Sequence, residues 1–165
     1  MSIHFHSEKI PFKLKNRKAI KQWLYAAILA EKKSPGEINF IFCTDAYLLG
    51  LNQNYLKHNT YTDIITFDYT DKKNNPSLIW GDIFISVERV KENASKFNVA
   101  IDDELHRVMI HGVLHLMGYK DKTKSAKLLM TKKEDFFLGK KNYPQRTRRM
   151  RKERREFVSI YNLQF

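Results

Sequence analysis

The segment from His111 to Asp121, HGVLHLMGYKD, constrains the fold of this chain more than any other. His111 and His115 are four residues apart, so an α-helix would place both imidazole rings on one face, one turn apart. Gly118 follows, and glycine readily takes the left-handed conformation that ends a helix. The chain can then turn and bring Asp121 back toward the histidines. The segment therefore predicts a helix that ends in a tight turn, where three polar side chains meet.

These three side chains are a set of ligands that zinc accepts in proteins. Two imidazole nitrogens and one carboxylate oxygen leave the fourth tetrahedral position open to water, which is typical of catalytic zinc sites. Structural zinc sites usually have four protein ligands. We therefore expect one zinc ion, or another divalent transition metal, at His111, His115 and Asp121. The alternative is a pair of hydrogen-bonded core histidines that binds no metal.

The composition predicts one basic domain. The chain has 165 residues, enough for a single hydrophobic core. Its one cysteine, Cys43, excludes an intrachain disulfide, and no apolar run approaches the roughly 18 residues of a membrane helix. Because the first residues also lack the features of a signal peptide, we expect a cytoplasmic protein with no membrane partner. The formal net charge of +12 favours a polyanionic partner, with nucleic acid ahead of a membrane surface.

Basic residues gather near the end of the chain. The segment 145–156, QRTRRMRKERRE, contains seven arginines and lysines against two glutamates. We expect residues 1–144 to form the folded domain and residues 145–165 to form a basic C-terminal tail. Such a run is typical of an arm that neutralises phosphates. The alternative is a solvated tail that only adds solubility.

Hydrophobic periodicity predicts a chain of alternating strands and helices. Strands are expected at 3–5, 37–43, 63–69 and 79–86, and helices at 16–33, 45–56, 87–97, around the two histidines, and at 123–138. The third and fourth strands are expected to pair as a hairpin. The order β-α-β-α-β-β-α-α-α predicts a single α+β domain. Its mixed sheet of about four strands would carry packed helices, with the zinc site on a helix and the turn after it.

Local signals predict several helix starts. Thr44 and Thr123 are expected to be N-caps, because a threonine hydroxyl can accept a hydrogen bond from a free backbone N–H of the first turn. Asp102 or Asp103 is expected to cap the helix that carries the histidines. We therefore expect that helix to begin at this acidic pair.

Two further residues of the histidine helix need an explanation. Gly112 costs up to about 1 kcal/mol of helix propensity relative to alanine, so we expect it to pack closely against a neighbouring element. Glu104 projects near the face of His111. An exposed surface carboxylate is favoured for Glu104 over a hydrogen bond to the site.

Three blocks of sequence, taken together, resemble the YbeY family of metal-dependent endoribonucleases. The block at 51–67 is similar to the family pattern LN-x-x-YR … TDVLSF, the block at 81–86 to the strand GDI-x-IS, and the block at 111–121 to HG-x-LHL-x-GYDH. The resemblance covers most of the chain, from about residue 38 to residue 133. It implies a single-strand-specific, metal-dependent endoribonuclease that acts in ribosomal RNA maturation and ribosome quality control. The partners it implies are ribosomal RNA, ribosomal subunits and a ribosome-associated GTPase.

The chain departs from the family pattern at two positions. Asp121 stands where the family usually has a third histidine ligand, and an aspartate oxygen is still a normal zinc ligand. Leu56 stands where the family commonly has an arginine that faces the site. The residues that we expect to bind substrate are Lys57, next to this position, together with Thr62 and Asp63 of the second block.

A metal at the three ligands would serve catalysis by activating its water and by polarising a phosphoryl oxygen. Either that water or an RNA 2′-hydroxyl would attack the phosphorus, and both remain open. Gly112 replaces the glutamate of the HExxH protease motif, which argues against peptide hydrolysis. Asp63 and Asp82 are candidates for a supporting carboxylate. Their alternative role is hydrogen bonding or capping at strand edges.

Two other functions remain open at this point. The chain could be a non-catalytic ribosome-assembly factor that binds ribosomal RNA and uses its metal for structure, or a metal-dependent hydrolase of a small phosphorylated molecule. Any RNA binding should rest on phosphate contacts from lysines and arginines, and so weaken with salt. Single-stranded bases could stack on Tyr61, Tyr69 or Tyr119.

Overall fold

The computed structural model describes residues 2–141, so the expected domain boundary at residue 144 and the tail at 145–165 lie outside the described residues. The elements follow in the expected order: β1 Ser2–Glu8, α1 Arg17–Ala30, β2 Ser34–Cys43, α2 Asp45–Leu51, the π-helical turn η1 Asn52–Leu56, β3 Ile64–Asp68, β4 Leu78–Ser86, α3 Val87–Lys96, α4 Ile101–Leu116 and α5 Lys124–Gly139. Helix α1 ends earlier and β2 begins earlier than expected.

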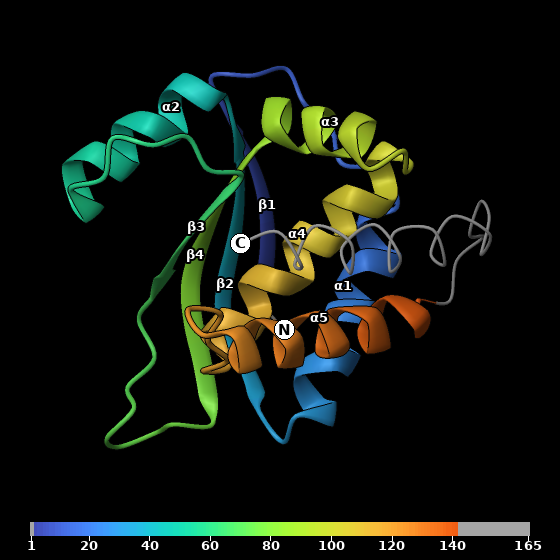
Figure 1. Ribbon diagram of the computed structural model, residues 1–165. Coiled ribbons are helices and arrows are strands. Elements are labelled where there is room, and N and C mark those ends of the chain that lie inside the picture. Colours follow the sequence, from blue (N-terminus) through green and yellow to red (C-terminus); the bar gives the residue numbers. More distant parts are fainter. Residues whose placement is uncertain (1, 142–165) are drawn as a thin grey trace.

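The four strands form one mixed sheet in the order β1-β2-β4-β3. Strand β2 pairs in parallel with both β1 and β4, whereas β3 pairs antiparallel with β4. The predicted hairpin and the predicted α+β class are confirmed. Strand β3 is therefore an edge strand, with one side free of any partner strand among the described residues. Helices α1, α4 and α5 lie to one side of the sheet, and α2 lies to the other (Figure 1).

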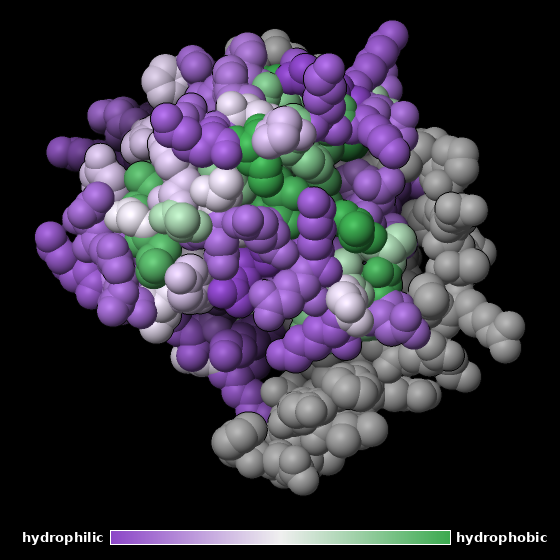
Figure 2. Space-filling view, turned by 90° about the horizontal axis from the view of Figure 1, so that it is seen from above, coloured by the Kyte–Doolittle hydropathy of each residue, from purple (hydrophilic) through white to green (hydrophobic). Residues whose placement is uncertain are grey.

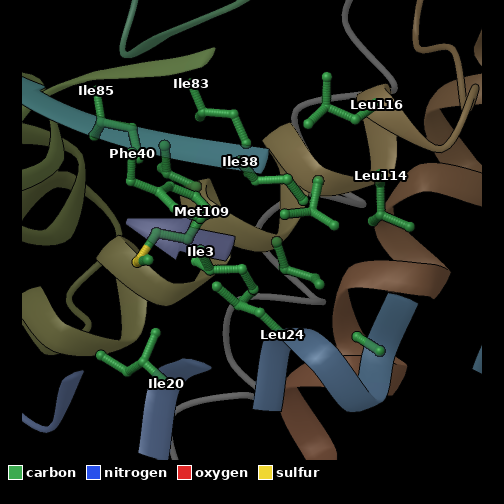
Figure 3. Packing of buried hydrophobic residues seen from close by; sticks show 14 of the residues in the cluster. Ile3, Ile20, Leu24, Ile38, Phe40, Ile83, Ile85, Met109, Leu114 and Leu116 are labelled. Atoms are coloured by element: carbon green, nitrogen blue, oxygen red, sulfur yellow. The ribbon is translucent and has the colours of Figure 1, made fainter. Parts of the chain in front are cut away.

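The main core lies between the sheet and helices α1 and α4. Alternate residues of a strand point to opposite faces, so each central strand places a row of apolar side chains against these helices. Figure 3 shows Ile38, Phe40, Ile83 and Ile85 from the sheet, Met109, Leu114 and Leu116 from α4, and Ile20 and Leu24 from α1, gathered in this cluster. A smaller cluster of Cys43, Leu48 and Ile65 lies under α2.

The two threonine caps are confirmed. Thr44 accepts a hydrogen bond from the backbone N–H of Tyr47 at the start of α2. Thr123 accepts one from Ala126 at the start of α5. Each hydroxyl thus binds one of the N–H groups that a first helical turn leaves without a partner.

The predicted cap of α4 is wrong. Its N-cap is Ala100, whose carbonyl oxygen accepts hydrogen bonds from the backbone N–H groups of Asp103 and Glu104. Asp102 and Asp103 instead lie in the first turn. Their carboxylates there are close to the positive end of the helix dipole, which stabilises them without a capping hydrogen bond.

The end of α4 that carries the histidines packs closely against the sheet at Gly112. A Cβ atom on this glycine would lie 2.8 Å from Cγ2 of Ile83 and 2.9 Å from Cδ1 of Ile64. The expected close packing is therefore confirmed, and it involves the hairpin strands β3 and β4. One turn later, Leu116 packs over Gly81 of β4 in the same way. These two contacts set the distance between the histidine end of the helix and the sheet.

Hydrophilic side chains cover most of the face over α2 and α3, with hydrophobic side chains gathered in a few places between them (Figure 2). Large exposed hydrophobic side chains elsewhere include Leu128, Leu129 and Phe136 of α5. Within residues 2–141, no helix has both the length and the apolar character needed to cross a membrane.

Candidate metal centre

The three expected ligands meet at the end of α4. The Nε2 atoms of His111 and His115 lie 2.9 Å apart. Oδ2 of Asp121 lies 3.7 Å from Nε2 of His111 and 3.6 Å from Nε2 of His115. The ligand atoms all lie within 4.8 Å of one another, so one metal ion can contact all three. The spacing in the sequence therefore predicted this cluster.

The turn after α4 brings Asp121 back to the histidines. Gly118 has φ +100°, a backbone conformation that residues with a Cβ atom rarely adopt. The N–H of Gly118 donates to the carbonyl oxygen of His115 at 2.9 Å, and the N–H of Tyr119 donates to that of Leu114 at 3.0 Å. These two bonds close the helix end as the glycine stop predicted.

The side chain of Tyr119 fixes the turn to two other helices. Its hydroxyl donates to Oε2 of Glu31 at the end of α1, at 2.6 Å, and Nζ of Lys133 in α5 donates to Oε1 of Glu31 at 2.7 Å. Burial would raise the pKa of Glu31, but these hydrogen bonds and the charge of Lys133 outweigh it, so the pKa is lowered. Lys133 also lies over the Tyr119 ring, 5.3 Å from its centroid. One of the three rings that could stack on bases is thus also part of a structural contact.

A hydrogen-bond acceptor lies behind each histidine. Nδ1 of His111 is 2.7 Å from Oε1 of Glu134, and Nδ1 of His115 is 3.0 Å from the carbonyl oxygen of Tyr119. A neutral imidazole that donates from Nδ1 keeps an unprotonated Nε2, which is the form that binds a metal. Both Nε2 atoms face the shared point near Asp121, so this donor set fits a divalent transition metal.

Glu134 is held in turn by an arginine of α4. Nη1 of Arg107 binds Oε2 of Glu134 at 2.8 Å, and Nη2 of Arg107 binds Asp135 at 2.7 Å. The sequence interpretation missed this network. Its signal was present: Arg107 lies one turn before His111 on the same face, and Glu134 and Asp135 are the only acidic residues of α5. The pairing of α4 with α5, however, was not readable from either helix alone.

The prediction for Glu104 is wrong. The residue is 2% exposed, not a surface carboxylate. The reason is that helices and strands cover α4 on most of its circumference, so residues on several of its faces are buried. The expectation assumed one buried stripe, which is the pattern of a helix at the surface of a domain.

The surroundings shift the pKa values of His111 and His115 in opposite directions. Burial would lower the pKa of His111, but the hydrogen bond and charge of Glu134, helped by Asp121 and Asp63, raise it above its ordinary value. Burial lowers the pKa of His115, and the neighbouring His111 lowers it further, while Asp121 offsets part of this shift. Of the two rings, His111 therefore binds a proton more readily when no metal is bound.

Of the two candidate supporting carboxylates, only Asp63 acts on the centre. Its charge contributes to the raised pKa of His111, and its Oδ2 accepts a hydrogen bond from Asn93 at 3.2 Å. Asp82 neighbours Ile83, which faces α4, so its side chain points to the opposite face of the sheet. There it accepts hydrogen bonds from Asn39 and Tyr69. For Asp82 the alternative role, hydrogen bonding within the sheet, describes the structure.

The other expected substrate-binding residues lie before β3. Oγ1 of Thr62 donates to the carbonyl oxygen of Ile64 at 3.2 Å. Lys57 is exposed, with φ +58° at the end of η1, and its Nζ donates to the carbonyl oxygen of Asn54 at 3.4 Å. Leu56, at the position of the family arginine, is 45% exposed. The structure therefore leaves Lys57 and Leu56 open to solvent.

Two histidines one turn apart, an aspartate from the following turn and a glutamate behind the first histidine form a candidate metal site on an α+β fold. The family model described as Endoribonuclease YbeY matches residues 2–142. An Endoribonuclease YbeY of Flavobacterium psychrophilum is 53% identical over 133 residues, which cover 81% of this chain and 91% of the relative. That of Cytophaga hutchinsonii is 47% identical over 142 residues, covering 86% and 97%.

One solved structure is similar to this chain in fold and in sequence. The solution structure of a protein from Thermotoga maritima matches with a TM-score of 0.57 and 27% identity, covering 84% of this chain and 90% of that one. The chain belongs to the endoribonuclease YbeY family, whose members are RNA-cleaving hydrolases. The resemblance carried by the three sequence blocks is confirmed.

Proposed function

We propose that this protein is a metal-dependent endoribonuclease that hydrolyses phosphodiester bonds of single-stranded RNA. His111, His115 and Asp121 would hold the metal, and zinc suits this set of ligands. The observation that carries the proposal is the meeting of these three ligand atoms within 4.8 Å of one another, in a chain of an RNA-cleaving family.

The residues around the centre have distinct roles in this proposal. When bound, the metal lowers the pKa of water and polarises a phosphoryl oxygen. Glu134 and the carbonyl oxygen of Tyr119 keep the Nε2 atoms of the two histidines turned toward it. Asp63, whose charge helps to raise the pKa of His111, would be the carboxylate that accepts a proton from the attacking group.

Substrate binding would come from the segment that precedes β3. The exposed ammonium group of Lys57 can contact a phosphate of the RNA. Thr62 and Asp63 lie directly before the first residue of β3. The alternative is a non-catalytic factor that binds ribosomal RNA and holds a structural metal. It draws support from Leu56, since a leucine supplies no charge where the family commonly has an arginine.

We place the reaction in ribosomal RNA maturation and ribosome quality control, in the cytoplasm. Ribosomal subunits and a ribosome-associated GTPase would be the partners. Support for this step comes from the three family blocks and from the net charge of +12, which suits an RNA-rich particle. The expected basic tail, 145–165, would add phosphate contacts.

The test is cleavage of a fluorescently labelled single-stranded RNA by the full-length protein. Cleavage should stop on addition of a chelator, return with added zinc, and be lost in His115→Ala. His4→Ala removes an exposed histidine of β1 and should cleave like the unaltered protein. RNA binding without cleavage under all metal conditions would contradict the proposal and favour the assembly factor.

A further inference from the structure

Helix α5 and the turn before it carry an unusual concentration of exposed lysines. Lys120 and Lys122 lie on either side of Asp121, and further exposed lysines follow along α5. We call this surface the lysine face; it consists of Lys120, Lys122, Lys124, Lys127, Lys132 and Lys140. It spans the 16 residues of α5, a length of about 24 Å at the helical rise.

No acidic group of the described residues neutralises this surface. The two acidic residues of α5, Glu134 and Asp135, both bind Arg107 instead. Lys133, a lysine of α5 that is not part of the lysine face, forms an ion pair with Glu31. Among residues 2–141, none of the six lysines of the lysine face forms an ion pair with a carboxylate. Their charges are therefore available to a polyanion.

The lysine face begins at the candidate metal centre. Asp121, one of the three ligands, lies between its first two lysines. On its buried side, α5 reaches the same centre through Glu134, which binds Nδ1 of His111. An RNA strand held at the candidate metal centre can therefore contact the first lysines of this surface.

Apolar side chains lie between the lysines. Leu128, Leu129 and Phe136 are 58%, 47% and 54% exposed. Nζ of Lys140 lies over the Phe136 ring, 5.3 Å from its centroid. A cation beside an exposed aromatic ring is the combination that single-strand-binding proteins use for phosphates and stacked bases. An anionic membrane also suits basic and apolar side chains on one helix, but RNA is favoured because the surface begins beside the candidate metal centre.

We propose that the lysine face of α5 binds the phosphate backbone of the RNA strand on one side of the bond to be cleaved, with an unpaired base stacked on Phe136. This inference rests on the proposed function, because it takes the metal centre as the place of cleavage. Helix α5 would thus add to the affinity for the strand that Lys57 and Thr62 provide, while the chemistry stays at the end of α4.

The test reverses two charges on the exposed side of α5. In the full-length protein, Lys132→Glu with Lys140→Glu should weaken binding of a labelled single-stranded RNA, measured by fluorescence anisotropy, by roughly tenfold at low salt. The slope of log affinity against log salt should become shallower by about 1.4, since each phosphate contact of a single strand contributes about 0.7. In cleavage assays KM should rise while kcat stays within about twofold of the original.

A matched control makes the same change of net charge elsewhere. Lys91→Glu with Lys96→Glu reverses two exposed lysines of α3, which lies at the opposite end of the molecule from α5 (Figure 1). This variant should keep RNA affinity within about twofold. The neutral pair Lys132→Gln with Lys140→Gln should show an intermediate loss of RNA affinity. It tests the same lysines even if the charge-reversed pair fails to fold.

Three outcomes would overturn the proposal. One is unchanged RNA affinity in both α5 variants, and another is an equal loss in the α3 variant. The third is lost binding to phosphatidylserine vesicles with RNA binding intact, which would assign the surface to a membrane. If neither the unaltered protein nor any variant cleaves RNA, the proposed function fails. If the α5 variants still bind RNA more weakly than the unaltered protein, the RNA-binding surface stands.

Discussion

Two hydrogen-bond acceptors decide which imidazole nitrogens of the candidate metal centre face Asp121. Glu134 and the carbonyl oxygen of Tyr119 each bind an Nδ1 atom, so both Nε2 atoms are left toward Asp121. Partners of this kind orient the ring and raise its basicity, and removing one typically lowers metal affinity by about 10–100-fold. At the scale of residues, the candidate centre therefore consists of three potential ligands and two hydrogen-bond acceptors.

Glu134→Ala should lower zinc affinity by about 10–100-fold, because His111 loses the partner that fixes its orientation. Glu134→Gln keeps one acceptor oxygen and should lose less. Competition with a chromophoric chelator measures both. Glu92→Ala, which removes an exposed partner of Arg89 on α3, is the control and should bind zinc normally. Equal zinc affinity in Glu134→Ala and in the unaltered protein would contradict this role.

At the scale of elements, contacts between helix α4 and the hairpin hold the centre in place. Gly112 lets α4 approach Ile64 and Ile83 more closely than a side chain would permit. The contact is local to the turn between the two histidines, so a change of spacing there moves the ligands. A substitution at this glycine should affect both stability and metal binding.

Gly112→Ala should destabilise the protein by about 1–3 kcal/mol, the usual cost of an added methyl group in a packed interior. This cost exceeds the gain of up to about 1 kcal/mol in helix propensity. Gly50→Ala in α2 is the matched control, since nothing lies within 4 Å of its added Cβ. Urea unfolding should show a loss for the first and no loss for the second. A stabilised Gly112→Ala would contradict the packing argument.

The elements and the meeting of the three candidate ligands were predictable from the sequence for a common reason, because their signals are local. The spacing of His111 and His115, the glycine stop and the threonine caps all act within one or two helical turns. Glu134 was missed because its role depends on α5 packing beside α4, 23 residues away along the chain. The cap of α4 was missed because a helix can begin at Ala100 with only backbone hydrogen bonds at its first turn.

At the scale of the whole molecule, a buried histidine joins three parts of the described chain. His106 of α4 packs edge-on against Trp23 of α1, and its Nδ1 lies 3.2 Å from Nζ of Lys141, after α5. Burial, together with the charge of Lys141, lowers the pKa of His106 from 6.5 to about 3. The folded protein therefore keeps this ring neutral in a pH range where the unfolded chain protonates it.

This difference makes stability depend on pH. Below its ordinary pKa of 6.5, His106 binds a proton only in the unfolded chain, until the pH approaches about 3. Its contribution to the free energy of unfolding is thus lost as pH falls, by about 1.4 kcal/mol per pH unit in this window. Urea unfolding between about pH 7 and about pH 5 should show a loss of about 2 kcal/mol that His106→Gln lacks. Parallel pH profiles for the two proteins would contradict the assignment.

We propose that His111, His115 and Asp121 together hold one metal ion. The most direct measurement is elemental mass spectrometry of protein purified without chelators or a metal-affinity tag. We predict about one zinc or similar transition metal per chain, and little metal in a folded Asp121→Ala variant. A folded sample with no metal that also fails to take up added zinc would contradict the account, as would full metal retention in Asp121→Ala.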